Sequence, residues 1–135
     1  MVDDSGYLVS TVVGNKTMPS GKRAVVLNAG LNLLYVSTWY DLKISPVKDY
    51  SKAYEDVTLY GPLCMNIDVV RENVLLPNMS RGDHLVIHPV GAYNVTQWMQ
   101  FIEMRPAVIL IQQGGNVKEI RRRETVDDIN AMELE

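Results

Sequence analysis

The sequence has 135 residues, 47% of them hydrophobic and 21% charged, and a formal net charge of −3. A chain of this size can bury its own core without a disulfide or a metal, and a slightly acidic balance gives no general reason to expect nucleic-acid binding. No apolar run reaches the ~18–20 residues of a membrane span, and the residues after Met1 lack the basic and apolar regions of a signal peptide. Cys64 is the single cysteine, so no internal disulfide can form, which fits a reducing compartment. We therefore expect one cytoplasmic domain, with no membrane and no nucleic-acid partner.

The first half of the chain predicts short strands separated by turns. Pro19-Ser20-Gly21 is a turn signal between two segments rich in β-branched residues, which should form a hairpin. Pro46 biases its predecessor away from helix, and Gly61-Pro62 ends an alternating segment. Residues 30–40 are mixed and aromatic, without helical periodicity. The strands expected here are residues 7–13, 22–27, 44–46 and 54–60.

The second half continues this pattern. Arg81-Gly82-Asp83 and Gly114-Gly115 indicate turns, and residues 91–99 indicate a loop with one helical turn. The apolar run at residues 107–111 is typical of a buried strand. The extended segments expected here are residues 67–70, 74–76, 84–88, 107–111 and 117–120.

The end of the chain has a different character. Arg121, Arg122 and Arg123 form a dense basic run, but acidic residues follow at once, so we expect a solvated face rather than a phosphate-binding patch. The segment Thr125-Val-Asp-Asp128 has the form of a capping box, with Asp in place of the preferred Glu or Gln, and predicts a short terminal helix. Six or more short strands separated by turn residues favour an all-β barrel or sandwich with little helix.

Cys64 follows the Gly61-Pro62 bend and allows two interpretations. As a structural residue it would be a small apolar side chain at the end of a strand. As a functional residue it would be a thiol on a loop, where reactive groups are common. A free thiol is mostly protonated at neutral pH, so it can donate a proton as well as act as a nucleophile. The chemistry of the residue leaves both interpretations open.

Histidine and tyrosine supply the other candidate side chains. His84 and His88 have an i, i+4 spacing, but on a strand with ~3.3 Å per residue they would lie ~13 Å apart, too far to share a metal ion. We therefore expect no metal site. Tyr93 follows two small residues in Gly91-Ala92-Tyr93. It would ordinarily be a half-buried packing residue, although its hydroxyl could also donate to a ligand phosphate.

Four segments form an ordered pattern along the chain. They are Asn28-Ala-Gly-Leu-Asn32 leading to Tyr40; Gly61-Pro-Leu-Cys64 with Asp68; Pro77, Gly82-Asp83, Gly91-Ala-Tyr93, Phe101 and Arg105-Pro106; and Arg121-Arg-Arg-Glu-Thr125-Val-Asp-Asp128. Taken together they resemble the carboxy-terminal domain of the diaminopimelate, ornithine and arginine decarboxylases, which depend on pyridoxal 5'-phosphate. The ending is most similar to the bacterial diaminopimelate branch. Each motif is weak alone, but the order and spacing match over essentially all 135 residues.

The resemblance implies a fold and a domain organisation. The implied fold is a Greek-key-like β-barrel or sandwich with a short C-terminal helix, similar to the C-terminal domain of alanine racemase, over residues 1–135. In this family a separate α/β barrel carries the lysine that binds the cofactor covalently. That lysine is therefore expected outside this chain and is not assigned to Lys16 or Lys22. The implied partners are that barrel, as a missing segment or a separate chain, and a second subunit in a homodimer.

The resemblance also implies roles for individual residues. Cys64 matches the cysteine that reaches across the dimer interface and is thought to protonate the carbon that has lost carbon dioxide. Tyr93 matches the tyrosine that helps to hold the cofactor, and Tyr40 matches a tyrosine near the distal end of the substrate. Asp68 matches a common aspartate of the cysteine segment, with a structural or orienting role.

Two positions depart from the diaminopimelate branch. Met65 stands where an acidic residue usually follows the cysteine, and Val36-Ser37 stands where an Arg-Pro pair usually precedes the tyrosine. An arginine there would bind a distal carboxylate through two hydrogen bonds, and an unpaired substrate charge in a closed pocket costs on the order of several kcal/mol. We therefore expect an amino-acid substrate that is larger or less charged than diaminopimelate, with Tyr40 and Met65 as contacts.

Three hypotheses from different classes remain. The first is a decarboxylase segment that is inactive alone. The second is a non-catalytic dimerisation or regulatory module derived from the same family, and the third is a related pyridoxal-phosphate racemase. Cys64 and Tyr93 favour the first hypothesis, Met65 and Val36 leave room for the second, and the cysteine segment argues against the third.

Overall fold

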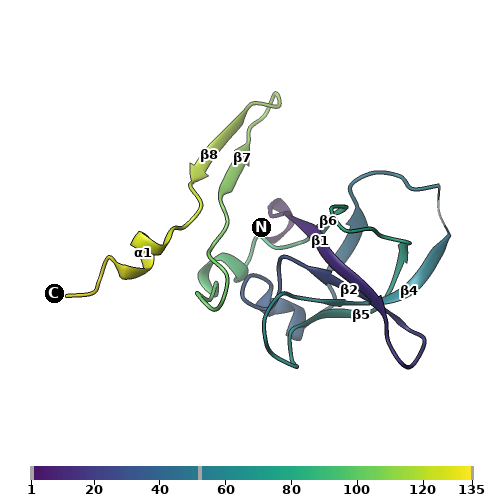
Figure 1. The fold of residues 1–135 in the computed structure, drawn as a ribbon. Helices are drawn as coiled ribbons and strands as arrows, with labels where there is room; N and C mark the ends of the chain where they lie inside the picture. Colours follow the sequence, from purple (N-terminus) through teal and green to yellow (C-terminus); the bar gives the residue numbers. More distant parts are fainter. Residues whose placement is uncertain (1, 52, 135) are drawn as a thin grey trace. The chain divides into compact units, whose positions relative to one another are not determined.

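The computed structural model describes residues 2–51 and 53–134 and divides into two compact units, Met1–Trp98 and Met99–Glu135. The first unit is built mainly from strands, which are coloured from purple to green in Figure 1. Its strands are β1 (Leu8–Thr17), β2 (Arg23–Leu27), β3 (Lys43–Pro46), β4 (Tyr54–Tyr60), β5 (Val69–Pro77) and β6 (His84–His88). Its single turns of 3₁₀ helix are η1 (Asp3–Ser5), η2 (Tyr35–Thr38) and η3 (Asn94–Thr96).

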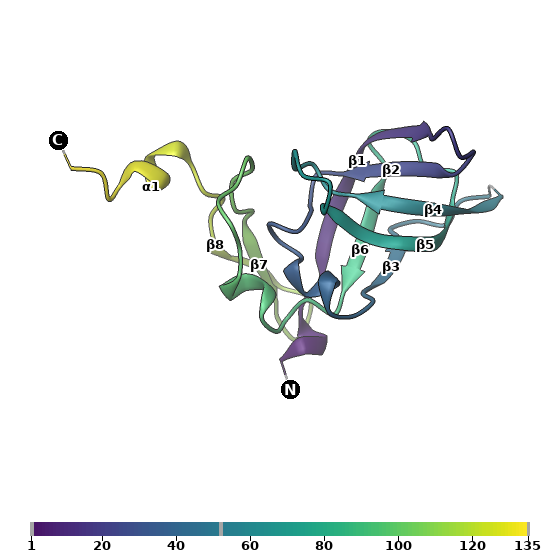
Figure 2. The ribbon, with the colours of Figure 1, turned by 90° about the horizontal axis from the view of Figure 1, so that it is seen from below.

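The strands of the first unit form one six-stranded sheet in the order β3-β6-β1-β2-β4-β5. The long strand β1 joins its two halves, because Leu8–Thr11 pairs with β6 and Val12–Thr17 pairs with β2. Strands β2 and β4 run parallel, and the other neighbouring pairs are antiparallel. The edge strand β3 also contacts β5, so the sheet is nearly closed (Figure 2). The predicted all-β, barrel-like class is confirmed.

The interior of the curled sheet is the hydrophobic core of this unit. Burial of a Val, Leu or Ile side chain contributes roughly 1.5–3 kcal/mol relative to leaving it exposed, so this core is the main source of stability. Ser10 and Val12 of β1 are both buried, as expected for alternate residues that face the same side of a strand. The largest fully buried side chains are Leu27, Leu31, Leu34, Leu42, Leu59, Leu76, Met79, Leu85, Ile87, Val12, Val25 and Val36.

Strand β5 differs from its prediction. The sequence predicted two short extended pieces, at residues 67–70 and 74–76, and the structure has the single strand Val69–Pro77. The polar residues Arg71, Glu72 and Asn73 interrupt the apolar pattern, so the sequence does not predict one continuous strand. Asn73 has a φ of 55°, a left-handed conformation that Asn tolerates better than most residues. The pairing of β5 with β4 is correspondingly irregular.

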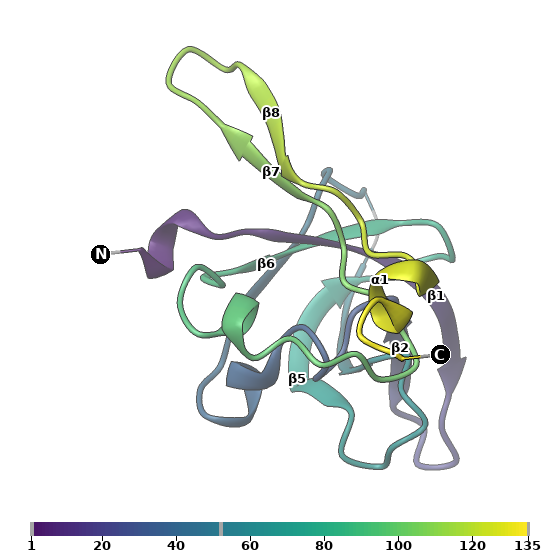
Figure 3. The same ribbon diagram turned by 90° about the vertical axis from the view of Figure 1, so that its left-hand side faces the viewer.

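The second unit contains the hairpin of β7 (Val108–Ile111) and β8 (Val117–Arg121), followed by the helix α1 (Val126–Asn130) (Figure 3). Both strands were predicted, but the expectation that residues 107–111 are buried was wrong. Ile109, Leu110 and Ile111 are exposed, because the hairpin is a two-stranded sheet of its own. Among the described residues, no helix is both long and apolar enough to cross a membrane.

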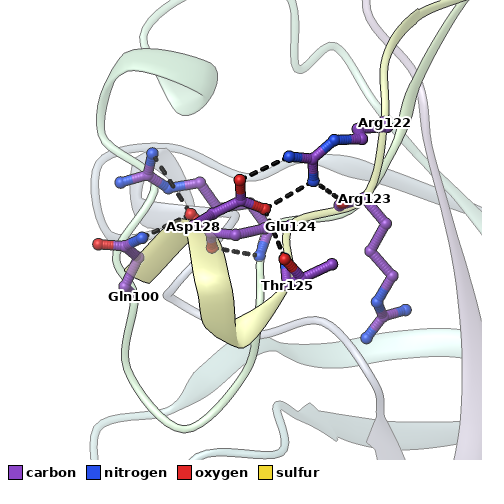
Figure 4. Close-up of polar contacts among 7 residues, drawn as sticks. Gln100, Arg122, Arg123, Glu124, Thr125 and Asp128 are labelled. Atoms are coloured by element: carbon purple, nitrogen blue, oxygen red, sulfur yellow. Dashed lines mark hydrogen bonds and ion pairs between the residues drawn. The ribbon is translucent and has the colours of Figure 1, made fainter. Parts of the chain in front are cut away.

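Polar contacts organise the end of the second unit (Figure 4). Arg122 donates to both carboxylate oxygens of Asp128, each at 2.6 Å, and also to the backbone oxygen of Arg123. The backbone N–H of Thr125 donates to Asp128 at 2.8 Å as half of a capping box, which confirms the predicted start of the terminal helix. Glu124 accepts from Gln100 and from the backbone of Arg105. The arginine run is therefore partly neutralised by its acidic neighbours.

Candidate functional site

The loop between β4 and β5 carries Cys64 and forms a tight turn at the end of β4 (Figure 2). It is closed at its base by a backbone hydrogen bond from the N–H of Gly61 to the carbonyl of Asp68, at 2.9 Å. Cys64 lies exposed on this loop, and Met65 beside it is half-buried. The apolar side chain of Leu63, immediately before the cysteine, is buried and anchors the loop. The thiol is therefore held on the surface and can be reached from outside.

Asp68 lies on the inner side of the same loop. Its side chain is buried, and its carboxylate accepts the N–H of Leu63 at 2.7 Å and the N–H of Leu31 at 2.8 Å. Gly30 and Gly61 leave the space that the carboxylate occupies, since a Cβ atom on either residue would overlap its oxygens. One buried side chain thus connects the cysteine loop to a segment more than thirty residues earlier in the chain.

Tyr93 projects from the loop after β6. Its φ of 64° is unusual for a tyrosine, the residue is 62% exposed, and the turn η3 follows it directly. The residues before it are fixed by the amino-terminal turn: Gly91 N–H donates to the Asp3 carbonyl at 3.0 Å, and Ala92 N–H donates to the Asp3 carboxylate at 3.2 Å. A non-glycine residue in this conformation costs roughly 1–2 kcal/mol, so the surrounding contacts have to compensate.

Aromatic side chains gather around Tyr93. The Trp39 ring meets the Tyr93 ring edge-on, with 6.0 Å between centroids, and meets the Tyr35 ring in the same way at 5.7 Å. The pKa of Tyr40 is raised, first by burial and then by the nearby negative charge of Asp3 and by the neighbouring phenol of Tyr93. Edge-to-face pairs of this kind are each worth about 0.5–1.5 kcal/mol beyond the area that they bury.

The structure thus gathers the predicted site residues into two groups. One group is the cysteine loop, with Cys64, Met65 and Asp68. The other is the aromatic group, with Tyr40 and Tyr93. Sequence reasoning missed Trp39 and Asp3, which join the second group through tertiary contacts. In the sequence, the only sign that Trp39 belongs to this group is its place directly before Tyr40.

Four further residues bear on the predicted chemistry. Val36 is fully buried in the core, so its side chain takes no part in the exposed surface around Tyr40. The ammonium group of Lys22 donates to Asn73 at 2.6 Å and lies 3.7 Å from a carboxylate oxygen of Asp56. His84 and His88 stand at the two ends of β6. Within residues 2–51 and 53–134, no group of three His, Cys, Asp or Glu side chains is arranged to hold a metal ion.

Comparisons with known proteins identify the family of this chain. A family profile described as "Pyridoxal-dependent decarboxylase, C-terminal sheet domain" matches residues 1–91. Diaminopimelate decarboxylase of Helicobacter pylori is 31% identical over 140 residues, which cover 100% of this chain and 34% of that protein. The corresponding enzyme of Deinococcus radiodurans is 31% identical over 137 residues, which cover 99% of this chain and 35% of that protein.

Solved structures give the same result. The crystal structure of diaminopimelate decarboxylase from M. jannaschii in complex with L-lysine superposes with a TM-score of 0.89 and 29% identity, over 98% of this chain and 31% of that chain. The chain thus spans about a third of the length of the curated relatives that it matches. The family match covers more than half of the sequence, and the fold agrees with it. The chain belongs to the pyridoxal-dependent decarboxylases and corresponds to their C-terminal sheet domain.

Proposed function

We propose that this chain is the C-terminal domain of an amino-acid decarboxylase, inactive alone, that supplies Cys64 as a proton donor to the active site of a neighbouring subunit. The observation that carries the proposal is the position of the thiol, exposed on an anchored loop at the edge of the sheet. An S–H group in that position can give its proton to a carbon that has just lost carbon dioxide.

Tyr93 is the residue of this chain that would hold the cofactor. Its exposed phenol can donate one hydrogen bond to a phosphate oxygen, and the bonds from Gly91 and Ala92 to Asp3 fix the backbone that presents it. Pyridoxal 5'-phosphate, when bound, supplies the electron sink that decarboxylation needs.

The lysine that binds the cofactor covalently lies outside this chain in this proposal. Lys22 is a poor candidate because its ammonium group is already engaged by Asn73 and Asp56. Such a lysine would come from an α/β barrel, and the relatives are about three times as long as this chain, which leaves room for one. A cytoplasmic homodimer completes the proposal, since each active site would need parts of two subunits.

The substrate that we propose is an amino acid other than diaminopimelate. Neither Met65, beside the thiol, nor Val36, buried in the core, offers a charge to a distal carboxylate or amine. The surface around Tyr40 is aromatic instead, with Trp39 and Tyr93 in edge contact. A less charged distal group suits such a surface better. Assay of the complete enzyme on meso-diaminopimelate tests this part, and efficient turnover would overturn it.

The role of Cys64 is tested in the complete enzyme, with the domain joined to its barrel. We expect Cys64→Ala to lower kcat by about 10²–10⁴, as removal of a proton donor does, and to alter the incorporation of deuterium from D₂O into the product. Asn66→Ala, in the same exposed loop, is the matched control and should leave both measurements unchanged. An unchanged rate and product in Cys64→Ala would refute the assignment.

Mixed dimers test whether the thiol acts across subunits. Cys64→Ala is combined with a variant that lacks the cofactor-binding lysine of the barrel, each being inactive as a homodimer. If Cys64 serves the neighbouring site, a mixed dimer contains one intact site and regains activity. Mixed dimers that form but stay inactive would mean that the thiol serves its own subunit.

A further inference from the structure

We propose that Asp68 is a positioning residue that couples the cysteine loop to the segment leading to Tyr40, so that one buried carboxylate sets the positions of both. The proposal rests on the proposed function only for the use of Cys64 and Tyr40. The coupling itself is a property of this chain.

The first step is the pair of hydrogen bonds that the carboxylate accepts. One oxygen of Asp68 takes the N–H of Leu63 at 2.7 Å, next to Cys64, and the other takes the N–H of Leu31 at 2.8 Å. Each oxygen therefore serves a different segment. Because the side chain of Asp68 is only 2% exposed, water cannot readily replace either bond, and loss of the carboxylate would leave buried N–H groups unpaired.

The second step is the fit between the two segments. A Cβ atom on Gly61 would overlap the Asp68 carboxylate and also the Cα atom of Gly30. The two glycines thus let their backbones approach each other on the side where the carboxylate lies. Any residue larger than glycine at either position would push the segments apart and displace the carboxylate.

The third step connects Leu31 to the aromatic group. The carbonyl of Gly30 accepts the N–H groups of Leu33 and Leu34, both at 2.9 Å, and the carbonyl of Val36 accepts the N–H of Tyr40 at 3.2 Å. The side chains from Leu31 to Leu34 are buried, so this segment is rigidly packed. A displacement at Leu31 would therefore be carried toward Tyr40.

Amide hydrogen exchange in the full chain, followed by NMR, tests the coupling. In the wild type, the N–H groups of Leu31 and Leu63 should exchange through the same opening and with similar protection, because displacement of the Asp68 side chain breaks both hydrogen bonds at once. Asp68→Asn keeps one acceptor oxygen and turns its NH2 group toward the other N–H, so one of the two bonds is lost outright. If the segments are coupled, both N–H groups should nevertheless lose protection, by at least about tenfold. Asp83→Asn is the matched control, since the Asp83 carboxylate accepts the N–H of Ser80 at 2.7 Å in another loop.

A second variant changes the segment that carries Leu31 instead of Asp68 itself. Gly30→Ala should change the alkylation rate of Cys64, the single thiol, although Gly30 lies 34 positions earlier in the sequence. Gly14→Ala is its control, because a Cβ there meets only Val26, at 4.0 Å. If Asp68→Asn does not fold, the wild-type exchange and the Gly30→Ala rate decide the matter.

The coupling would be overturned if the amide N–H groups of Leu31 and Leu63 exchanged independently in the wild type. It would also be overturned if Gly30→Ala left the alkylation rate of Cys64 unchanged. Neither measurement involves decarboxylation, so a failure here is distinct from a failure of the proposed role of Cys64. In the complete enzyme, Asp68→Asn should lower kcat more than it changes KM, and Asp68→Glu, which restores the charge in a longer side chain, should recover part of the loss.

Discussion

Arg122 and Asp128 form a bidentate ion pair, in which two N–H groups of the guanidinium donate to the two oxygens of the carboxylate (Figure 4). The same carboxylate accepts from Thr125 at the start of α1. The arginine run that the sequence presents as a charged face is therefore bonded to the first turn of the short terminal helix.

The first prediction concerns acid and helix α1. Hydrogen bonds from Arg122, and then from Thr125, hold the pKa of Asp128 well below its usual value of 3.8. A carboxyl group with a lower pKa in the folded state stabilises above its unfolded pKa, and this contribution is lost as pH falls through the folded pKa. We therefore expect α1 to persist at pH ~4 and to fray only at more acidic pH, as followed by backbone chemical shifts of residues 126–130.

The matched variants for this prediction differ at adjacent acidic positions. Asp128→Asn should fray α1 already at neutral pH and remove most of its response to acid. Asp127→Asn, one residue earlier and without the contacts to Arg122 and Thr125 described above, should leave that response in place. Equal effects of the two variants would show that the ion pair does not hold the helix.

The second prediction concerns the missing arginine near Tyr40. Val36 is fully buried, so Val36→Arg would place an unpaired charge in the core and should lower the free energy of unfolding by about 3 kcal/mol or more. Thr38→Arg, at an exposed position of the same turn, should change it by less than about 1 kcal/mol. Urea unfolding of the full chain measures both. Similar stabilities would mean that residue 36 can turn toward the surface, and that an arginine there could serve a substrate.

The third prediction concerns the left-handed residue in β5. Asn73→Val should destabilise the chain by about 2 kcal/mol, since a β-branched residue is strained at a φ of 55° and the bond from Lys22 is lost. Asn73→Gly loses the same bond without the strain and should cost less. Glu72→Val, at the exposed neighbouring position of the same strand, should stay within about 0.5 kcal/mol of the wild type. If Asn73→Val and Glu72→Val have the same free energy of unfolding in urea, residue 73 is not strained.

Much of the fold could be predicted from local pattern. The bounds of β4 and β6 were predicted as they are found, because each strand alternates or is β-branched and is bounded by turn residues. The prediction of two separate pieces for β5 and the prediction that β7 is buried were wrong for different reasons. In β5 a tertiary pairing tolerates a polar, left-handed residue. In β7 an apolar run belongs to a two-stranded hairpin with no second layer within its unit.

The candidate site was less accessible from sequence. The resemblance singled out Asp68, but its contact with Leu31 spans 37 positions and follows from the way β4 and β5 bring their loop against the segment after β2. The edge contact of Trp39 with Tyr93 joins residues 54 positions apart. No local periodicity encodes such pairs, because they depend on how the sheet curls.

The last prediction tests the aromatic group through the ionisation of Tyr40. Its pKa is raised by burial, then by the charge of Asp3 and by Tyr93. Asp3→Asn removes the charge but keeps a side-chain oxygen that can still accept the N–H of Ala92. We therefore expect the pKa of Tyr40 to fall toward its usual value in Asp3→Asn while the loop of Tyr93 keeps its backbone conformation.

The titration of Tyr40 is followed by NMR of its ring carbons, and the amide shifts of Ala92 and Tyr93 report the loop. Asp4→Asn, at the neighbouring acidic position of the same turn, is the control and should leave the Tyr40 titration where it is. Tyr93→Phe should also lower the pKa of Tyr40, because it removes the second phenol whose ionisation opposes that of the first. If Asp3→Asn and Asp4→Asn act alike, the charge of Asp3 does not act on Tyr40, and the amino-terminal turn is not part of the aromatic group.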